Sequence, residues 1–171
     1  MVLKTKGDLM INPNVNINTP INNMYLRSNE LYVDVSAPER EELIASLKFL
    51  APKLQSFVVT FYESFLEKQT LSFIQNNTKE SLINMLSASL NLIIASIEQP
   101  LPLDDYLNVL VNSYPSFPSM IKNKDLFVRS FMNAVVYSFK GNYNERLGNL
   151  WYNAVASFVT TVEPFINQAN R

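Results

Sequence analysis

The sequence predicts an all-α domain, and three observations carry that prediction. Apolar residues recur at every third or fourth position over most of residues 37–164, which places them on one face of a helix. Prolines and capping residues divide this pattern into segments of helical length. Strand-like alternation of apolar and polar residues is not found after residue 36. We therefore expect about six to seven helices joined by short loops.

Residues 1–36 differ from the rest of the chain and are predicted to form an N-terminal arm. Seven asparagines lie in the first thirty positions, together with Pro13 and Pro20. Residues of this kind punctuate regular structure and do not build a packed core. A short helix is expected at TPINNMYL, with Thr19 as its cap and Pro20 in its first turn. This interpretation leaves residues 37–171 as one globular domain.

The first two expected helices carry their apolar residues in a helical pattern on either side of a proline. Ser36 and Glu39 form a capping box that starts the first helix. The segment FVVTFYESFL then pairs apolar residues at every fourth position, as a buried helix face does. Pro52 lies between these two patterns and is expected to separate or kink the helices.

The next two expected helices are also bounded by caps and prolines. Asn77 and Glu80 form a second capping box, and the helix that follows stops at EQPLP. Its apolar arc is broad, which indicates a central position. The segment LPLDDYLNVLVNSY forms the next helix, with Tyr106 and Tyr114 on its apolar face, and Pro115 ends it.

The last two expected helices are separated by a glycine. Gly141 is expected to terminate the helix on DLFVRSFMNAVVYSF in a left-handed conformation. Asn142 and Glu145 are expected to cap the final helix, which should stop at Pro164.

The composition excludes several classes of function. The chain contains no cysteine and no histidine, so thiolate zinc sites, cysteine nucleophiles and histidine general bases are absent. Fourteen basic and fifteen acidic residues are scattered without runs, which argues against a nucleic-acid partner. Three glycines do not supply a phosphate-binding loop. The unbroken apolar runs are too short to span a bilayer, so we expect a cytoplasmic, non-enzymatic protein without a metal.

The order and length of the helical segments resemble the globin family over about residues 39–166. The most specific matching residues are Phe61 and Tyr62 on the second helix and Trp151 on the last. In globins the fourth of these helices carries, near its end, the histidine that ligates haem iron, and Tyr114 stands in that place here. This departure is similar to the haemless sensor globins of spore-forming bacteria. Within that group the chain most resembles the free-standing sporulation-inhibitory proteins.

The resemblance implies a globin-like fold without haem, whose cavity at the haem position holds a fatty acid or a similar apolar ligand. The residues expected at this ligand come from the second to the fifth helices. They are Phe61, Tyr62, Phe65, Met85, Leu110, Tyr114, Phe117, Phe127, Phe131 and Arg129. Tyr62, Tyr114, Lys122 and Arg129 are candidate donors to a carboxylate head group. Each of these aromatic side chains also fits an ordinary filled core.

The last two helices carry more apolar positions than one helix face needs. In related sensor globins these two helices build a four-helix interface, so the resemblance implies a homodimer. The residues expected at that interface are Val136, Trp151, Tyr152, Val155, Phe158 and Val159. The alternative is that the surplus residues are single surface apolar residues, which are common.

The leading hypothesis is a non-catalytic regulatory protein that binds a fatty acid and inhibits a homologous sporulation sensor histidine kinase. It would either titrate the signal away from the kinase or pair with the sensor domain of the kinase. Two alternatives stay open. One is a haem or gas sensor that uses Tyr114 as an axial ligand. The other is a helical interaction module that binds no small molecule.

Overall fold

The computed structural model describes residues 30–69, 73 and 76–169, and over these residues the protein has an all-α fold, as predicted. Two strands of two residues each, β1 (Glu30–Leu31) and β2 (Leu101–Pro102), are the exception within the described part. The short helix expected at TPINNMYL lies outside the described residues. The described helices are α2 (Ala37–Leu50), α3 (Leu54–Leu66), α5 (Lys79–Glu98), α6 (Leu103–Ser113), α7 (Phe117–Lys122), α8 (Lys124–Phe139) and α9 (Glu145–Ala169), with the 3₁₀ turns η1 (Ala51–Lys53) and η2 (Lys140–Asn142).

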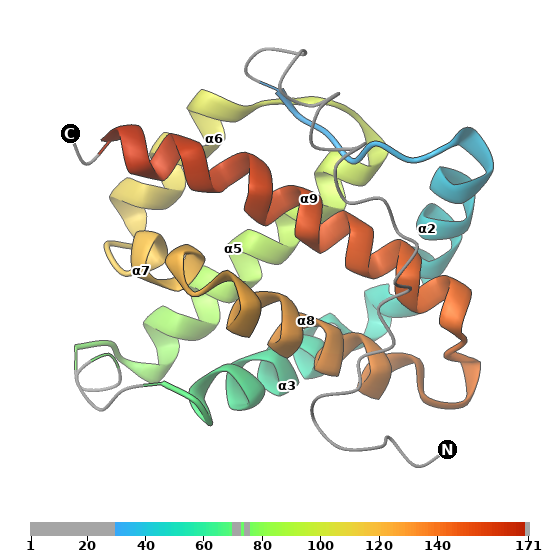
Figure 1. Cartoon of the computed structure of the whole chain (residues 1–171). Helices are drawn as coiled ribbons and strands as arrows, with labels where there is room; N and C mark the ends of the chain where they lie inside the picture. The colour runs from blue at the N-terminus through green and yellow to red at the C-terminus, as the bar shows by residue number, and fades with distance from the viewer. Residues whose placement is uncertain (1–29, 70–72, 74–75, 170–171) are drawn as a thin grey trace.

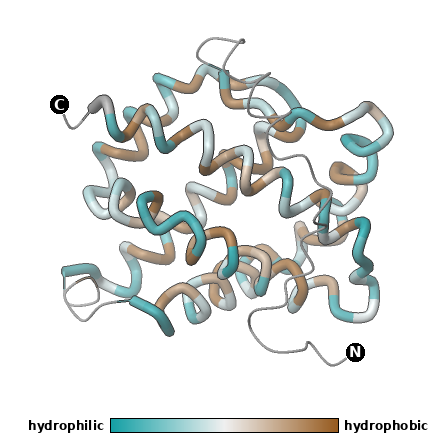
Figure 2. The backbone as a smooth tube through the Cα atoms, viewed as in Figure 1, coloured by the Kyte–Doolittle hydropathy of each residue, from teal (hydrophilic) through white to brown (hydrophobic). Residues whose placement is uncertain are grey.

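The long helices pack across one another around a single core. In Figure 1, α9 and α8 cross the front of the molecule, α5 passes behind them and α3 lies below. α3 packs on both α8 and α5, and α8 packs on α9. Hydrophobic and hydrophilic stretches alternate along these helices, as Figure 2 shows. Each helix therefore turns an apolar face to the core and a polar face outward.

Trp151 lies at the centre of the packing between α2, α8 and α9. Its ring centre is 5.9 Å from that of Phe131 and 6.5 Å from that of Phe139. Its indole Nε1 donates a hydrogen bond of 3.0 Å to the hydroxyl oxygen of Ser46 on α2. The buried indole thus keeps a polar partner, which a buried tryptophan N–H requires.

The segment before α2 belongs to the packed domain, which the arm predicted for residues 1–36 did not anticipate. Leu31 and Val33 are each 1% exposed. Leu31 pairs with Leu101 in the antiparallel β1–β2 ladder. The guanidinium of Arg40 donates hydrogen bonds to the carbonyl oxygens of Val33, at 2.8 Å, and Ile97. Two-residue strands are too short to give an alternating pattern, so the sequence did not predict this ladder.

The first capping box is confirmed. The backbone amide of Ser36 donates to a carboxylate oxygen of Glu39 at 2.8 Å, and the Ser36 hydroxyl donates to the same oxygen at 2.7 Å. Both hydrogen bonds lower the pKa of the Glu39 carboxyl, and the one from the Ser36 hydroxyl has the larger effect. The 3₁₀ turn that contains Pro52 separates α2 from α3, also as predicted.

The other two predicted capping boxes are wrong by one or two residues. The hydroxyl of Thr78, not Asn77, caps α5 by accepting a hydrogen bond of 3.1 Å from the amide of Ser81. Asn77 instead donates to the carbonyl oxygen of Phe73 at 2.8 Å. At α9 the cap is Asn144 rather than Asn142, because Asn144 Oδ1 accepts a hydrogen bond of 2.9 Å from the amide of Leu147.

Two predicted helix ends also differ from the structure. The left-handed residue after α8 is Lys140, with φ 40°, and Gly141 has no positive φ. α9 continues past Pro164 to Ala169 although proline removes one backbone donor. Ile166 beyond the proline is 1% exposed, so core contacts hold this last turn in place. After α6, Pro118 lies in the first turn of the unpredicted helix α7.

Two described stretches, Ala37–Leu66 and Lys79–Glu98, are long and apolar enough to cross a membrane by length and composition. The core helices of water-soluble proteins meet the same criterion. In α5 the side chains of Leu86, Ile93 and Ile97 are fully buried. The cytoplasmic location therefore stays a prediction.

Candidate functional site

Most of the residues predicted to face a ligand lie in the interior. Seven of them are at most 3% exposed: Phe61, Phe65, Met85, Leu110, Phe117, Phe127 and Phe131. The ring centre of Phe61 lies 5.1 Å from that of Phe127 and 5.5 Å from that of Phe131, edge to face. Such pairs are typical of a packed aromatic core. The structure brings these residues together, but the ring of Phe61 packs directly on those of Phe127 and Phe131, which leaves no space for a ligand between them.

The remaining predicted ligand residues lie closer to the surface. Tyr62 on α3 is half-buried, and so is Tyr114. Tyr114 follows the last residue of α6, and its carbonyl oxygen accepts a hydrogen bond of 2.9 Å from the amide of Phe117. Arg129 on α8 and Lys122 at the end of α7 are exposed. The predicted contact of Arg129 with an interior ligand is therefore wrong, because its side chain faces solvent. Tyr106, predicted on the apolar face of its helix, is 43% exposed.

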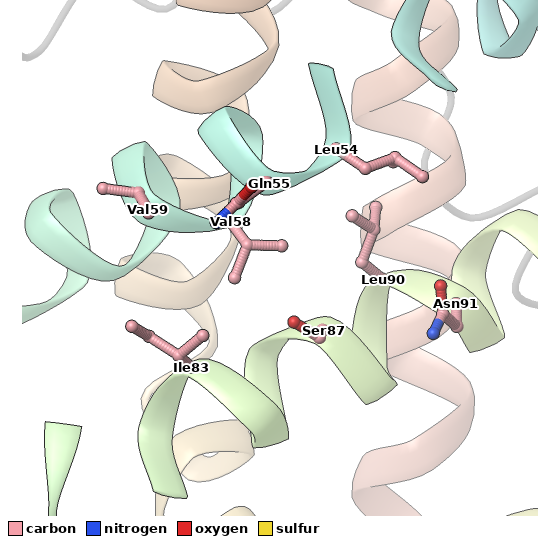
Figure 3. Close-up of a pocket in the computed structure, with 8 residues that line it drawn as sticks. All are labelled: Leu54, Gln55, Val58, Val59, Ile83, Ser87, Leu90 and Asn91. Atoms are coloured by element: carbon pink, nitrogen blue, oxygen red, sulfur yellow. The ribbon is translucent and has the colours of Figure 1, made fainter. Parts of the chain in front are cut away.

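An open groove runs between α3 and α5 (Figure 3), with a volume of about 290 Å³. Figure 3 shows Val58 pointing from α3 toward α5, with Ser87 opposite it. Serine is small, so it leaves the gap in front of Val58 unfilled. The polar lining groups are uncharged amide and hydroxyl side chains. The complete lining is Leu54, Gln55, Val58, Val59, Ile83, Ser87, Leu90 and Asn91.

The sequence pattern does not predict this groove. Leu54, Val58, Ile83 and Leu90 belong to apolar stripes, and such stripes predict a core face whether or not a gap remains between two helices. One signal was available in the sequence. Ser87 lies one helical turn after Ile83, where it interrupts the apolar face of α5 with a small residue.

A second groove lies on the other side of α3, toward α8, with a volume of about 630 Å³. Its lining includes the carboxylate of Glu63 and the ring of Tyr137, which is 49% exposed. The Lys140 ammonium lies 4.8 Å from the centre of the Tyr137 ring. Polar side chains make up most of this lining, so the α3–α5 groove is better suited to an apolar ligand. The lining is Pro52, Gln55, Ser56, Val59, Thr60, Glu63 and Tyr137.

The predicted dimer interface is wrong for four of its six residues. Within the single chain, these four are at most 2% exposed and would not touch a second copy: Trp151, Val155, Phe158 and Val159. α9 packs on α2, α5, α7 and α8, and these neighbours cover its surplus apolar positions. Val136 and Tyr152 are half-buried, so they keep some surface.

Two partly buried tyrosines, Tyr143 and Tyr152, are expected to make the fold less stable at alkaline pH. Burial, and next the Asp125 carboxylate, raise the pKa of the Tyr152 phenol above its ordinary value of 10.0. Burial and then Glu145 raise the pKa of Tyr143 in the same way. Below pH 10 both tyrosines are protonated in the folded and unfolded states. Above pH 10 the phenols ionise in the unfolded state before they ionise in the folded state. The free energy of unfolding is therefore expected to fall as the pH rises through the raised pKa values of the folded state.

Urea unfolding between pH 8 and 11 checks this expectation. In the double variant Tyr143→Phe/Tyr152→Phe the free energy of unfolding should fall less steeply with rising pH than in the wild type. Each single variant should show a smaller part of this effect. An unchanged pH slope in the double variant would contradict the assignment.

Among the described residues, no group of three or more Asp and Glu side chains could hold a metal ion. No family model, curated protein or solved structure matches this chain. The resemblance to haemless sensor globins therefore stays a prediction that rests on the residues quoted for it.

Proposed function

We propose that this protein is a non-catalytic binding protein that takes up a fatty acid or a similar apolar molecule. The α3–α5 groove carries the proposal, because it is open and has apolar walls. Its volume of about 290 Å³ is near the lower end of small-molecule sites, which span roughly 300–1,000 Å³. In the interior the ring of Phe61 contacts those of Phe127 and Phe131, so we place the ligand in this groove rather than among these rings.

The order of the helices supports a globin-like fold as part of the same proposal. α3 lies between α5 and α8, and α2 packs on both α5 and α9. Tyr114 directly follows the last residue of α6, close to the helix end at which the resemblance puts the haem-ligating histidine.

We further propose, from the resemblance, that ligand binding is regulatory and inhibits a homologous sporulation sensor kinase. Titration of the signal and pairing with the sensor domain of the kinase are the two routes. A groove variant that binds no lipid separates them in an inhibition assay. If that variant still inhibits, titration is wrong, and if added lipid restores kinase activity, titration is supported.

Native mass spectrometry of the purified protein is the first test of binding. We expect a mass increase equal to one fatty acid, either as purified or after addition of decanoate. Ser87→Phe should abolish the increase, because the larger side chain fills the groove opposite Val58. Protein produced with haem supplied should show no Soret band. Bare polypeptide after addition of lipid would contradict the proposal.

One observation favours a second candidate, a helical interaction module without a small ligand. Phe57, Phe61, Phe127 and Phe131 are fully buried, and each of these rings contacts at least one of the others, as in a self-sufficient core. This candidate predicts that native mass spectrometry detects the protein without a ligand. It also predicts that the Ser87→Phe variant inhibits the kinase as strongly as the wild type does.

A further inference from the structure

The two ends of the α3–α5 groove differ in charge. Val59 and Ile83 form one end, as Figure 3 shows, and Asn91 lies at the other. One helical turn beyond Val59 on α3 is Tyr62, and one turn before Ile83 on α5 is Lys79. The Lys79 ammonium lies 5.7 Å from the centre of the Tyr62 ring. A cation and a phenol therefore stand together beyond one end, whereas the opposite end carries a neutral amide.

We propose that the groove binds a medium-chain monocarboxylate with its head group at Tyr62 and Lys79 and its alkyl tail directed toward Leu90 and Asn91. This inference rests on the proposed function and adds the chemical class, the orientation and the length of the ligand. Tyr62 was already a candidate donor. Lys79 is exposed, as Arg129 and Lys122 are, but it lies one helical turn before the groove residue Ile83 and beside Tyr62.

The charge at this end favours an anion. Lys79 is the first residue of α5, where the helix dipole adds positive potential to that of the ammonium. The Tyr62 hydroxyl can donate a hydrogen bond to a carboxylate, and the Lys79 ammonium can donate up to three. Glu80 is the neighbouring residue of opposite charge, and its carboxylate would repel the same head group. Glu63 lines the groove on the α8 side of α3 and faces away from this site.

The size of the groove limits the tail. A volume of about 290 Å³ lies near the lower end of small-molecule sites, so the apolar walls cover a tail of medium length better than a long one. Leu54 and Tyr62 are eight positions apart on α3, which corresponds to about 12 Å along the helix axis and is a second indication of a medium-length chain. A chain as long as that of hexadecanoate would extend beyond the apolar walls into water.

Isothermal titration of the full chain with decanoate, decan-1-ol and hexadecanoate tests the proposal. We expect wild-type protein to bind decanoate more tightly than the alcohol or the longer acid. Lys79→Gln should weaken the binding of decanoate about tenfold and change the affinity for the alcohol by less than twofold, because the alcohol carries no charge. Glu80→Gln should strengthen the binding of decanoate. Lys124→Gln removes an exposed lysine at the first residue of α8, as Lys79 is the first residue of α5, and is the matched control, with no expected effect.

The outcomes separate this inference from the proposed function. If Lys79→Gln changes the affinity for neither decanoate nor the alcohol, or changes both affinities equally, the head-group placement is wrong. Tighter binding of hexadecanoate than of decanoate would overturn the length limit. In either case, loss of binding in Ser87→Phe would still support the groove as the site. If wild-type protein binds none of the three ligands, the proposed function itself fails.

Discussion

Replacing Phe131 with alanine is expected to lower the free energy of unfolding by about 3–5 kcal/mol. The side chain is fully buried on α8. Its ring centre lies 5.0 Å from that of Phe57, 5.5 Å from that of Phe61 and 5.9 Å from that of Trp151. Truncation removes apolar area from three partners at once and leaves a cavity that rigid neighbours on α3 and α9 do not fill. This side chain therefore ranks among the most sensitive positions in the fold.

Urea denaturation with the linear extrapolation measures this loss. Phe131→Leu keeps most of the volume and should lose markedly less than the alanine variant. Tyr137→Ala, on the same helix and 49% exposed, is the matched surface control and should change stability by no more than about 0.5 kcal/mol. A loss below 1 kcal/mol in Phe131→Ala would mean that the ring is not tightly packed. An interior ligand cavity would then regain support over the α3–α5 groove.

The aromatic core shows how far periodicity can predict an interior. The spacing of apolar residues correctly placed Phe61 on the buried face of its helix, and Phe127 and Phe131, which the resemblance implied at the ligand, are also fully buried. Periodicity indicates which face of a helix carries a side chain, and it contains no information on the distance between facing rings. A filled core and a ligand cavity therefore have the same sequence pattern. The ring distances of 5.1 Å and 5.5 Å from Phe61 come only from the three-dimensional structure.

The helix starts show a second limit. Asn77 and Thr78 are both good N-cap residues, so local rules do not choose between them. The choice is made by a tertiary contact, because the Ser116 hydroxyl, 39 residues away, donates a hydrogen bond to Asn77. The side-chain amide of Asn77 also reaches back to Phe73. A cap can thus be displaced by one residue when a competing partner uses the better side chain.

The surplus apolar residues of α9 show a third limit. Phe158 and Val159 were predicted to contact a second copy because Tyr152 is a surplus apolar residue on this helix and the resemblance implies a homodimer built from the last two helices. Both are buried inside the single chain because α2, α5, α7 and α8 surround α9. A helix that is apolar on several sides indicates contact on several sides, and the sequence does not say whether those contacts come from the same chain.

Replacing Arg40 with alanine is expected to cost about 2–4 kcal/mol and to release the segment before α2. The guanidinium donates to the carbonyl oxygens of Val33 and Ile97, and its central carbon lies 4.6 Å from the centre of the Tyr32 ring. One side chain therefore joins the N-terminal segment to the end of α5. Its loss leaves two partly buried carbonyl groups without their charged donor.

Amide hydrogen exchange distinguishes this local role from a general loss of stability. In Arg40→Ala we expect faster exchange at Leu31 and Leu101 of the β1–β2 ladder than the global change predicts. Arg40→Lys keeps the positive charge but not the planar fork that reaches two carbonyls, so it should recover less than half of the loss. Exchange that rises equally in the ladder and in α8 would mean that Arg40 stabilises the whole fold. The segment would then be held by the burial of Leu31 and Val33 alone.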